Sequence, residues 1–289
     1  MGAVYKAEHV RMGKALAVKV LRGSFAKDPA AVARFRAEAQ IVSRLSHPHT
    51  IGVFDFGEIE GPEGGFYLAM EYVPGKDLAQ VLREEHRLTE ERAAAIADQV
   101  LGSLGEAHEV GIVHRDVKPG NVMLLHTRSD GDFVKVLDFG IAKLRDATGG
   151  EGETSAGAII GTPNYLSPEQ ARGEALDARA DLYSVGALLY ELVAGRPPFA
   201  GPNPMAIVAA HLTQRPASLR EVAPGVSEAF AELVPKALEK RPEDRSQSTE
   251  EMRLALQRAA EPGTRTLALQ VEDVPGTTGD LQIARRQDF

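Results

Sequence analysis

Residues 114–121 read His114-Arg115-Asp116-Val117-Lys118-Pro119-Gly120-Asn121, and the interpretation of the whole chain starts from them. The segment follows an apolar helical pattern, so it forms a loop that can present several polar side chains to one site. Asp138 ends the next predicted hairpin. Asp116, Asn121 and Asp138 can therefore place three oxygen-bearing groups around one pocket. Hard oxygen donors suit Mg²⁺, which binds through one or two side chains together with substrate phosphates.

The first residues of the chain predict a β-hairpin. Two β-prone runs, 4–7 and 15–21, are separated by a turn that contains Gly13. In the second run Ala17 and Lys19 share one face, because side chains alternate along a strand.

A helix is expected directly after this hairpin. Asp28 is a good N-cap residue and Pro29 suits the first helical position, and the pattern continues to about Leu45. Glu38 lies within the apolar stripe of this helix. A buried carboxylate is costly unless it is paired. The sequence therefore predicts a cation opposite Glu38, for which Lys19 is the candidate.

The remaining pattern places strands mainly in the first third of the chain and helices after it. Further strands are expected at 51–56, 66–72, 122–125 and 133–137, and helices at 89–111, 177–194, 204–213, 227–240 and 248–260. Segments 144–162 and 261–289 have no sustained periodicity. This order predicts an α+β protein in two lobes. We expect a small β-rich lobe at 1–73, a larger helical lobe at 74–260 and a flexible tail at 261–289.

Composition narrows the classes of function. The chain has 289 residues, with 33 Lys and Arg against 41 Asp and Glu, and a formal net charge of −8, which argues against a nucleic-acid-binding protein. It has no cysteine, so disulfides and a Cys nucleophile are excluded, and the cytoplasm is the expected compartment. No apolar run reaches the roughly 18 to 20 residues of a membrane span, so we expect no membrane segment.

Further motifs share the order and spacing of one family. They are Ala17-Val18-Lys19, Glu38, Met70-Glu71-Tyr72-Val73, the loop at 114–121, Asp138-Phe139-Gly140, Gly161-Thr162-Pro163-Asn164-Tyr165-Leu166-Ser167-Pro168-Glu169, Asp181-Leu182-Tyr183-Ser184-Val185-Gly186 and Arg245. With them, residues 1 to 258 resemble the protein kinase family, and specifically the eukaryotic-like Ser/Thr kinases of bacteria. The resemblance implies a two-lobed protein kinase-like fold of class α+β. It also implies transfer of the γ-phosphate of ATP to Ser/Thr hydroxyls of proteins.

The resemblance implies the catalytic roles. Asp116 would accept or orient the proton of the substrate hydroxyl, and Lys118 would neutralise charge on the transferring phosphoryl group. Asn121 and Asp138 would hold Mg²⁺, with Mn²⁺ as the alternative ion. The partners are then ATP and proteins that carry Ser or Thr, with no nucleic acid and no membrane segment.

The nucleotide-binding residues follow from the same resemblance. Lys19 would grip the α- and β-phosphates of ATP and would be fixed by Glu38. The residues around the base are Val4, Ala17 and Met123, whose side chains would sandwich the adenine, and Glu71 and Val73, whose backbone would hydrogen-bond it.

Regulation by phosphorylation is also expected. Arg115 would clamp a phosphate added to segment 144–162, with Thr154 or Ser155 as the acceptor. A buried ion pair is the alternative for Arg115, and plain linker composition is the alternative for the two hydroxyls. Thr162 would place a hydroxyl near the catalytic loop, with an ST-turn as its alternative.

Structural roles are expected for other motif residues. His114 would stack under Phe139 and tie the catalytic loop to the metal-binding turn. Asp181 would cap backbone N–H groups of the catalytic loop. Glu169 would pair with Arg245, so none of these residues is expected to contact ATP.

One departure from the family pattern is large. The Gly-rich loop of kinases reads G-x-G-x-x-G-x-V, and here only Gly2-Ala3-Val4 matches its end, so we expect a first strand and two glycines to be missing. The favoured function is a protein Ser/Thr kinase that autophosphorylates in signalling. A pseudokinase-like scaffold, impaired by the missing loop, stays open as the alternative. A small-molecule phosphotransferase is disfavoured, because residues 161–169 resemble a platform for peptide substrates.

Overall fold

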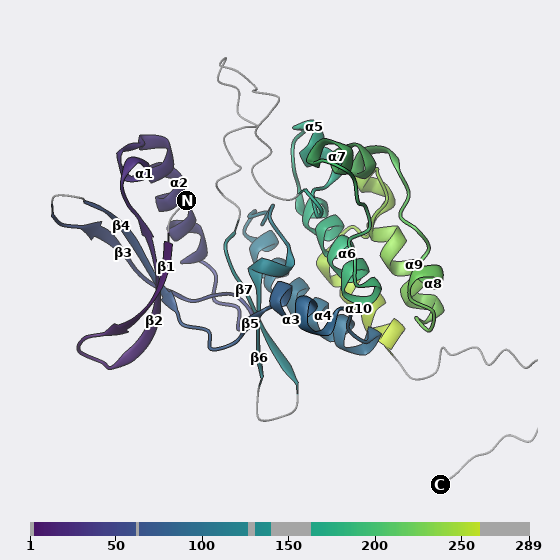
Figure 1. Ribbon diagram of the computed structural model, residues 1–289, viewed down its shortest axis with the longest axis horizontal. Coiled ribbons are helices and arrows are strands. Elements are labelled where there is room, and N and C mark those ends of the chain that lie inside the picture. Colours follow the sequence, from purple (N-terminus) through teal and green to yellow (C-terminus); the bar gives the residue numbers. More distant parts are fainter. Residues whose placement is uncertain (1–2, 62–63, 127–130, 140–162, 261–289) are drawn as a thin grey trace, which may run out of the picture.

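The computed structural model describes residues 3–61, 64–126, 131–139 and 163–260. A four-stranded sheet and the helices within residues 24–42 lie at one end, and the remaining helices lie towards the other (Figure 1). The strands are β1 (Ala3–His9), β2 (Lys14–Leu21), β3 (Val53–Ile59), β4 (Gly65–Glu71), β5 (Lys76–Asp77), β6 (Val122–His126) and β7 (Asp132–Val136). The α-helices are α1 (Ser24–Lys27), α2 (Pro29–Val42), α3 (Leu78–Glu85), α4 (Glu90–Glu109), α5 (Pro168–Arg172), α6 (Ala178–Ala194), α7 (Pro204–Thr213), α8 (Leu219–Val222), α9 (Glu228–Ala237) and α10 (Thr249–Ala260). Short 3₁₀ helices cover Pro119–Asn121 and Pro242–Asp244.

The first sheet is antiparallel, with strand order β1-β2-β4-β3. β1 and β2 form the predicted hairpin, in which Val4 lies opposite Lys19. The turn passes through Gly13 at a φ of 61°, a conformation that glycine adopts without strain. This hairpin sets the direction in which Lys19 points.

Helix α2 packs beside this sheet and begins where the sequence predicts. Asp28 is its N-cap and accepts a hydrogen bond from the N–H of Ala30. The helix ends at Val42, three residues before the predicted Leu45, because the N–H of Leu45 bonds back to Val42 at 3.1 Å in a tighter turn. Phe35 anchors the helix on the sheet, with its ring centroid 5.8 Å from that of Phe56.

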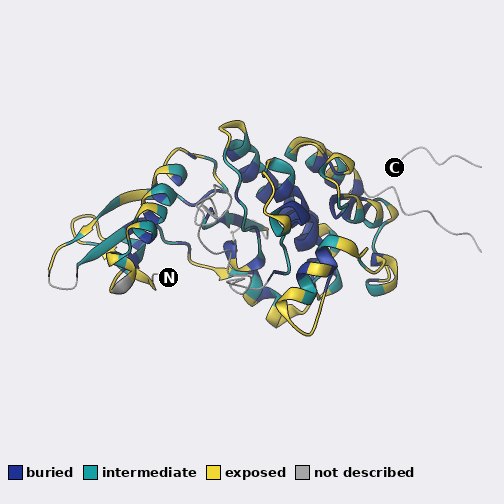
Figure 2. Cartoon of the chain, turned by 90° about the horizontal axis from the view of Figure 1, so that it is seen from above, coloured by how far each residue is buried: buried dark blue, intermediate teal, exposed yellow. Residues whose placement is uncertain are grey.

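The second sheet, β5-β6-β7, lies between the first sheet and the helices. The main core is in the helical part, where most of α6 is buried and α4 packs against both α6 and α10 (Figure 2). The long helices predicted at 89–111, 177–194, 204–213, 227–240 and 248–260 are confirmed. Helices α1, α3, α5 and α8 have four to eight residues each, too few for periodicity to show.

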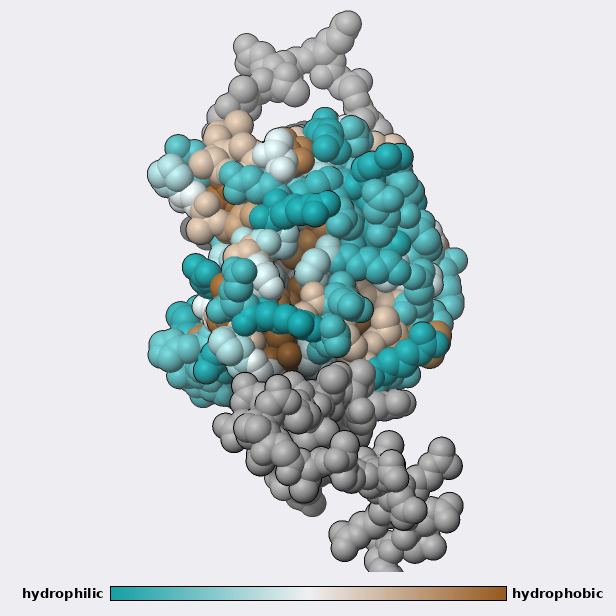
Figure 3. All heavy atoms as spheres, turned by 90° about the vertical axis from the view of Figure 1, so that its right-hand side faces the viewer, coloured by the Kyte–Doolittle hydropathy of each residue, from teal (hydrophilic) through white to brown (hydrophobic). Residues whose placement is uncertain are grey.

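The outer face of the helical end is mostly hydrophilic (Figure 3). None of the helices in the described residues has the length and apolar content that a bilayer crossing requires. The lobe boundary predicted at 73/74 lies between β4 and β5, and the predicted tail at 261–289 lies outside the described residues.

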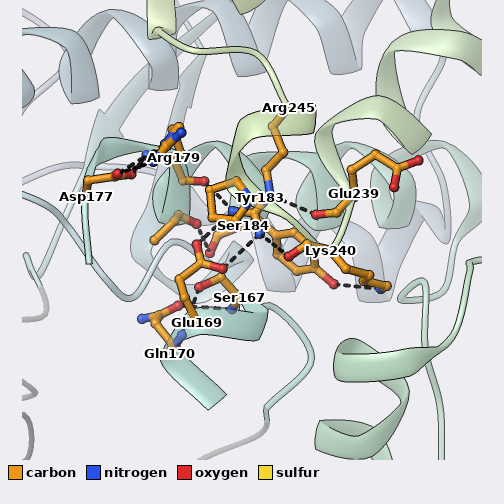
Figure 4. Close-up of polar contacts among 12 residues, drawn as sticks. Ser167, Glu169, Gln170, Asp177, Arg179, Tyr183, Ser184, Glu239, Lys240 and Arg245 are labelled. Atoms are coloured by element: carbon orange, nitrogen blue, oxygen red, sulfur yellow. Dashed lines mark hydrogen bonds and ion pairs between the residues drawn. The ribbon is translucent and has the colours of Figure 1, made fainter. Parts of the chain in front are cut away.

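A buried ion pair joins α5 to the chain that follows α9 (Figure 4). The guanidinium of Arg245 contacts both carboxylate oxygens of Glu169 at 2.7 and 2.8 Å. Its other three hydrogen bonds go to the backbone carbonyls of Glu239, Arg179 and Lys240. The Arg245 side chain has no exposed area and that of Glu169 is 5% exposed. The predicted pair is therefore confirmed, with all five guanidinium N–H donors satisfied.

We expect Glu169→Ala to lower the free energy of unfolding by about 3–5 kcal/mol, because it leaves the guanidinium of Arg245 buried without a counter-charge. Glu169→Gln keeps an acceptor oxygen and should lose less. Urea denaturation followed by circular dichroism measures both.

The control is Glu228→Gln, which breaks the pair between Arg220 and Glu228, whose side chains are both more than half exposed. Exposed pairs are screened by water and contribute little. Equal losses in Glu169→Gln and Glu228→Gln would contradict this account of the buried pair.

Candidate active site

Lys19 is held between two carboxylates. Its Nζ lies 2.7 Å from Oε1 of Glu38 on α2 and 3.1 Å from Oδ1 of Asp138. The side chains of Lys19 and Glu38 are 17% and 15% exposed, whereas that of Asp138 is 48% exposed. The predicted cation opposite Glu38 is therefore Lys19. The same ammonium also joins α2 to the segment after β7.

The surroundings of Lys19 and Glu38 shift the pKa values of these two groups. Burial alone would lower the pKa of Lys19, but the two carboxylates outweigh it and hold the pKa above its ordinary value. Burial and the charge of Asp138 raise the pKa of Glu38 against the opposite effect of Lys19. One ammonium thus serves two carboxylates, and the more exposed of them, Asp138, can take a second cation.

The loop at 114–121 brings three of its predicted site residues together. Nζ of Lys118 donates to Oδ2 of Asp116 at 2.6 Å. Nδ2 of Asn121 donates to the same oxygen at 3.1 Å and to the backbone carbonyl of Asp116 at 2.8 Å. Asp116 is 23% exposed and Lys118 is 40% exposed, so both remain accessible from solvent.

Leu137 connects this loop to Asp138. Its N–H donates to the backbone carbonyl of Asn121 at 2.8 Å, and its own carbonyl is 3.0 Å from Nε2 of His114. Nε2 therefore carries the proton of the imidazole, while Nδ1 accepts from the N–H of Asp116 at 3.3 Å. Burial lowers the pKa of His114, which agrees with a neutral ring.

His114 also packs against Phe139, with ring centroids 4.5 Å apart, but the two ring planes are tilted by 38° rather than stacked as predicted. Neither the hydrogen bonds nor the ring contact of His114 indicate a role in proton transfer. Its role is to tie the loop to the segment that carries Asp138.

Asp181 on α6 caps backbone N–H groups of the loop at 114–121. Its carboxylate accepts from the N–H of His114 and from the N–H of Arg115, each at 2.8 Å, and lies 2.8 Å from Nε2 of His108 on α4. The capping role predicted for Asp181 is confirmed. Arg115 has a φ of 66°, a strained value for a residue with a side chain, and these bonds hold it there.

Arg115 shows no ion pair within the part of the chain that the structure describes. Its Nε is buried without a hydrogen-bond partner, and its carbonyl accepts from Nε2 of Gln170 at 2.8 Å. Thr154 and Ser155, which are predicted to receive a phosphate, lie outside the described residues, and so does Thr162, which is predicted to place a hydroxyl near the catalytic loop.

The run from 163 to 169 is fixed to α6. The hydroxyl of Tyr165 donates to Glu191, and its carbonyl accepts from the hydroxyl of Ser184 at 2.7 Å. Burial raises the pKa of Tyr165, with the charge of Glu191 acting in the same direction. These contacts fix residues 163–169, which are part of the predicted peptide platform, to α6. The next residue, Gln170, contacts the catalytic loop at Arg115.

The residues predicted to surround adenine come from both sheets. Val4 is on β1 and Ala17 is on β2, opposite Met70 of β4, whereas Met123 is on β6. Glu71 ends β4, and Val73 follows in the connection to β5. Val4 is 59% exposed and Val73 is 8% exposed, so the set includes both surface and core positions.

Sequence reasoning missed two residues that hold the loop, His108 and Gln170. Each acts through a contact distant in sequence, with Asp181 for His108 and with Arg115 for Gln170. His108 is in the last turn of α4 and Gln170 is the N3 residue of the capping box of α5, so each also has a local explanation. No signal in the sequence distinguishes this local role from the contact with a distant residue.

Comparisons with known proteins agree with this geometry. The family model of the protein kinase domain matches residues 1–255. The serine/threonine-protein kinase pkn3 of Myxococcus xanthus is 46% identical over 260 residues, which cover 89% of this chain and 47% of that protein. The serine/threonine-protein kinase PknB of Mycobacterium tuberculosis is 43% identical over 259 residues, or 89% of this chain and 41% of that protein.

A solved structure is also similar. The crystal structure of the Mycobacterium tuberculosis PknI kinase domain, a double mutant, matches with a TM-score of 0.68 and 30% identity, covering 90% of this chain and 91% of that one. The chain spans less than half the length of the two curated relatives. Since the family model covers most of the chain and the predicted two-part α+β fold is confirmed, this chain belongs to the protein kinase family.

Proposed function

We propose that this chain is an ATP- and Mg²⁺-dependent protein serine/threonine kinase that also phosphorylates itself. The observation that carries the proposal is the convergence of Lys118 and Asn121 on Oδ2 of Asp116, at 2.6 and 3.1 Å. Leu137 bonds this loop to the segment of Asp138. A base, a cation and two cation-binding oxygens therefore lie on one connected framework, as phosphoryl transfer requires.

The chemistry proposed for Asp116 is proton acceptance. The oxygen of the substrate hydroxyl forms a bond to the γ-phosphorus of ATP, the bond from that phosphorus to the bridging oxygen of ADP breaks, and the hydroxyl proton goes to Asp116. Lys118 lies beside Asp116, so its charge stabilises the negative charge of the transferring phosphoryl group.

Protein kinases use ATP with Mg²⁺ or Mn²⁺, and the oxygen donors here fit such an ion. Asn121 bonds Asp116 through Nδ2, which leaves its amide oxygen as the donor for a cation. Asp138 supplies a half-exposed carboxylate. We assign the metal to these two residues. The ion would neutralise charge on the phosphates of ATP.

Lys19 is assigned to the α- and β-phosphates, because Glu38 holds its ammonium in the space beside Asp138. The adenine is assigned to a second set of residues, namely the side chains of Val4, Ala17 and Met123 and the backbone of Glu71 and Val73.

We also propose how the chain is divided, which partners it has and where it is located. We propose lobes at 1–73 and 74–260, followed by a tail at 261–289. Protein substrates with Ser or Thr, no nucleic-acid partner and a cytoplasmic location also stay predictions, the last favoured by the lack of cysteine.

We expect Asp116→Asn to lower the rate of phosphate transfer about 100-fold or more, the scale of a lost general base. The affinity for ATP should stay close to that of the wild type, because Asp116 acts on the transferring group. Incorporation of labelled phosphate into a generic protein substrate measures the rate, and Asp55→Asn on the first sheet is the control. Normal turnover in Asp116→Asn would show that the assignment is wrong.

Asp138→Asn should weaken the metal site. We expect the Mg²⁺ concentration for half-maximal rate to rise at least about tenfold, a cost typical even of changes in the outer shell of metal sites. Nucleotide binding should weaken as well. A titration with an unchanged Mg²⁺ dependence would count against this metal role.

Arg115 motivates a prediction about regulation. It precedes Asp116 in the sequence, and its guanidinium has a buried Nε without a partner among the described residues, so it can bind a phosphate. We propose that active protein carries phosphate on Thr154 or Ser155 and that Thr162 serves the catalytic loop. Mass spectrometry should find this phosphate, and Arg115→Ala should remove its activating effect. An active protein without phosphate between residues 144 and 162 would disprove the idea.

A further inference from the structure

Glu106 on α4 binds the chain that follows α2. Its carboxylate accepts from the N–H of Ser46 at 3.0 and 3.1 Å, from the hydroxyl of Ser46 at 3.1 Å and from the N–H of His47 at 2.9 Å. These hydrogen bonds lower the pKa of Glu106 against the opposite effect of burial. The carboxylate is therefore ionised at neutral pH, and bonds to a charged acceptor are the stronger kind.

Two other contacts show that α4 is shaped to receive this segment. A Cβ atom at Gly102 would lie 3.0 Å from Cε1 of His47, so a side chain there would require the His47 ring to shift by a few tenths of an ångström. The hydroxyls of Ser103 and Thr50 are 2.7 Å apart and buried. Residues 102, 103 and 106 lie on one side of a helix, and all three face residues 46–50.

The segment 46–50 follows the end of α2. Ser46 comes four residues after Val42, where α2 ends. Further along, the carbonyl of His49 accepts from the N–H of Val136 on β7, and the N–H of Ile51 donates to the carbonyl of Val136. The segment therefore joins the end of α2, the helix that carries Glu38, to α4 and β7.

The same helix holds the catalytic loop. His108, two residues after Glu106, lies 2.8 Å from Asp181, which caps His114 and Arg115. Side chains two positions apart point to different sides of a helix. Helix α4 is therefore a common support for the loop that contains Asp116 and for the helix that contains Glu38.

We propose that Glu106 is a positioning residue that sets the place of Glu38, and through it of Lys19, relative to the catalytic loop. The inference rests on the proposed function, in which Lys19 binds the phosphates of ATP. It predicts that the effect of Glu106 on nucleotide binding passes through Glu38.

A double-mutant cycle tests this coupling. The four proteins are the wild type, Glu106→Ala, Glu38→Gln and the double variant, and the readout is the dissociation constant of a Mg²⁺-bound non-hydrolysable ATP analogue. We expect Glu106→Ala to raise this constant about threefold to thirtyfold alone, and less than about twofold when Glu38 is already changed. Glu106→Gln, which keeps one acceptor oxygen, should have a smaller effect than Glu106→Ala.

The control is Glu109→Ala, an exposed residue three positions later on α4, and it should leave nucleotide binding unchanged. Thermal melting confirms that each variant is folded at the assay temperature, and Glu106→Gln serves if Glu106→Ala does not fold. The proposal would be overturned if Glu106→Ala raised the dissociation constant equally in the wild type and in Glu38→Gln, or did not raise it at all.

Hydrogen exchange separates this proposal from the kinase assignment, because it needs no nucleotide. Amides of α2 should exchange faster in Glu106→Ala than in the wild type, with no change in Glu109→Ala. A wild type that fails to transfer phosphate would reject the proposed function, while faster exchange would still support the positioning role. Unchanged exchange in α2 would overturn it whatever the activity.

Discussion

The carboxylate of Asp181 is the constraint on which the catalytic loop depends. It has no exposed area, and an unpaired charge at such a place would cost several kcal/mol. Three donors satisfy it, namely the N–H groups of His114 and Arg115 and the ring of His108. In the loop conformation that brings these N–H groups to the carboxylate, Arg115 takes a positive φ. The buried charge therefore sets the loop on the core helix α6.

Two sets of hydrogen bonds connect this loop to the rest of the site. Leu137 bonds the loop through both its N–H and its carbonyl, so Asp138 follows at a fixed place. Lys19 on β2 contacts Asp138, and it also contacts Glu38 on α2. The candidate active site thus lies where the first sheet meets the helical part. Its parts are held together by the hydrogen bonds of Leu137 and by the ion pairs of Lys19.

The sequence predicted the long elements and two pairs of charges, Lys19 with Glu38 and Glu169 with Arg245. Helical patterns identified α2 and α4 because each buries an apolar face. Two β-prone runs on either side of a glycine turn identified β1 and β2. The pairing of Lys19 with Glu38 followed from one carboxylate in an apolar stripe. Helices α3, α5 and α8 were missed because they are short and are defined by caps and contacts rather than by a face.

The sequence by itself determined which side chains lie together in the loop at 114–121, because Asp116, Lys118 and Asn121 stand close to one another in the chain. It also determined the family through the order of its motifs. Tertiary structure alone decided how His108, Gln170 and Glu106 act. Glu106 and Gln170 bond backbone groups and His108 bonds the carboxylate of Asp181, in each case more than 50 residues away. Such backbone groups are the same in every residue. No local pattern can therefore reveal which carboxylate or amide will meet them, and only the packing of α4, α5 and α6 brings them together.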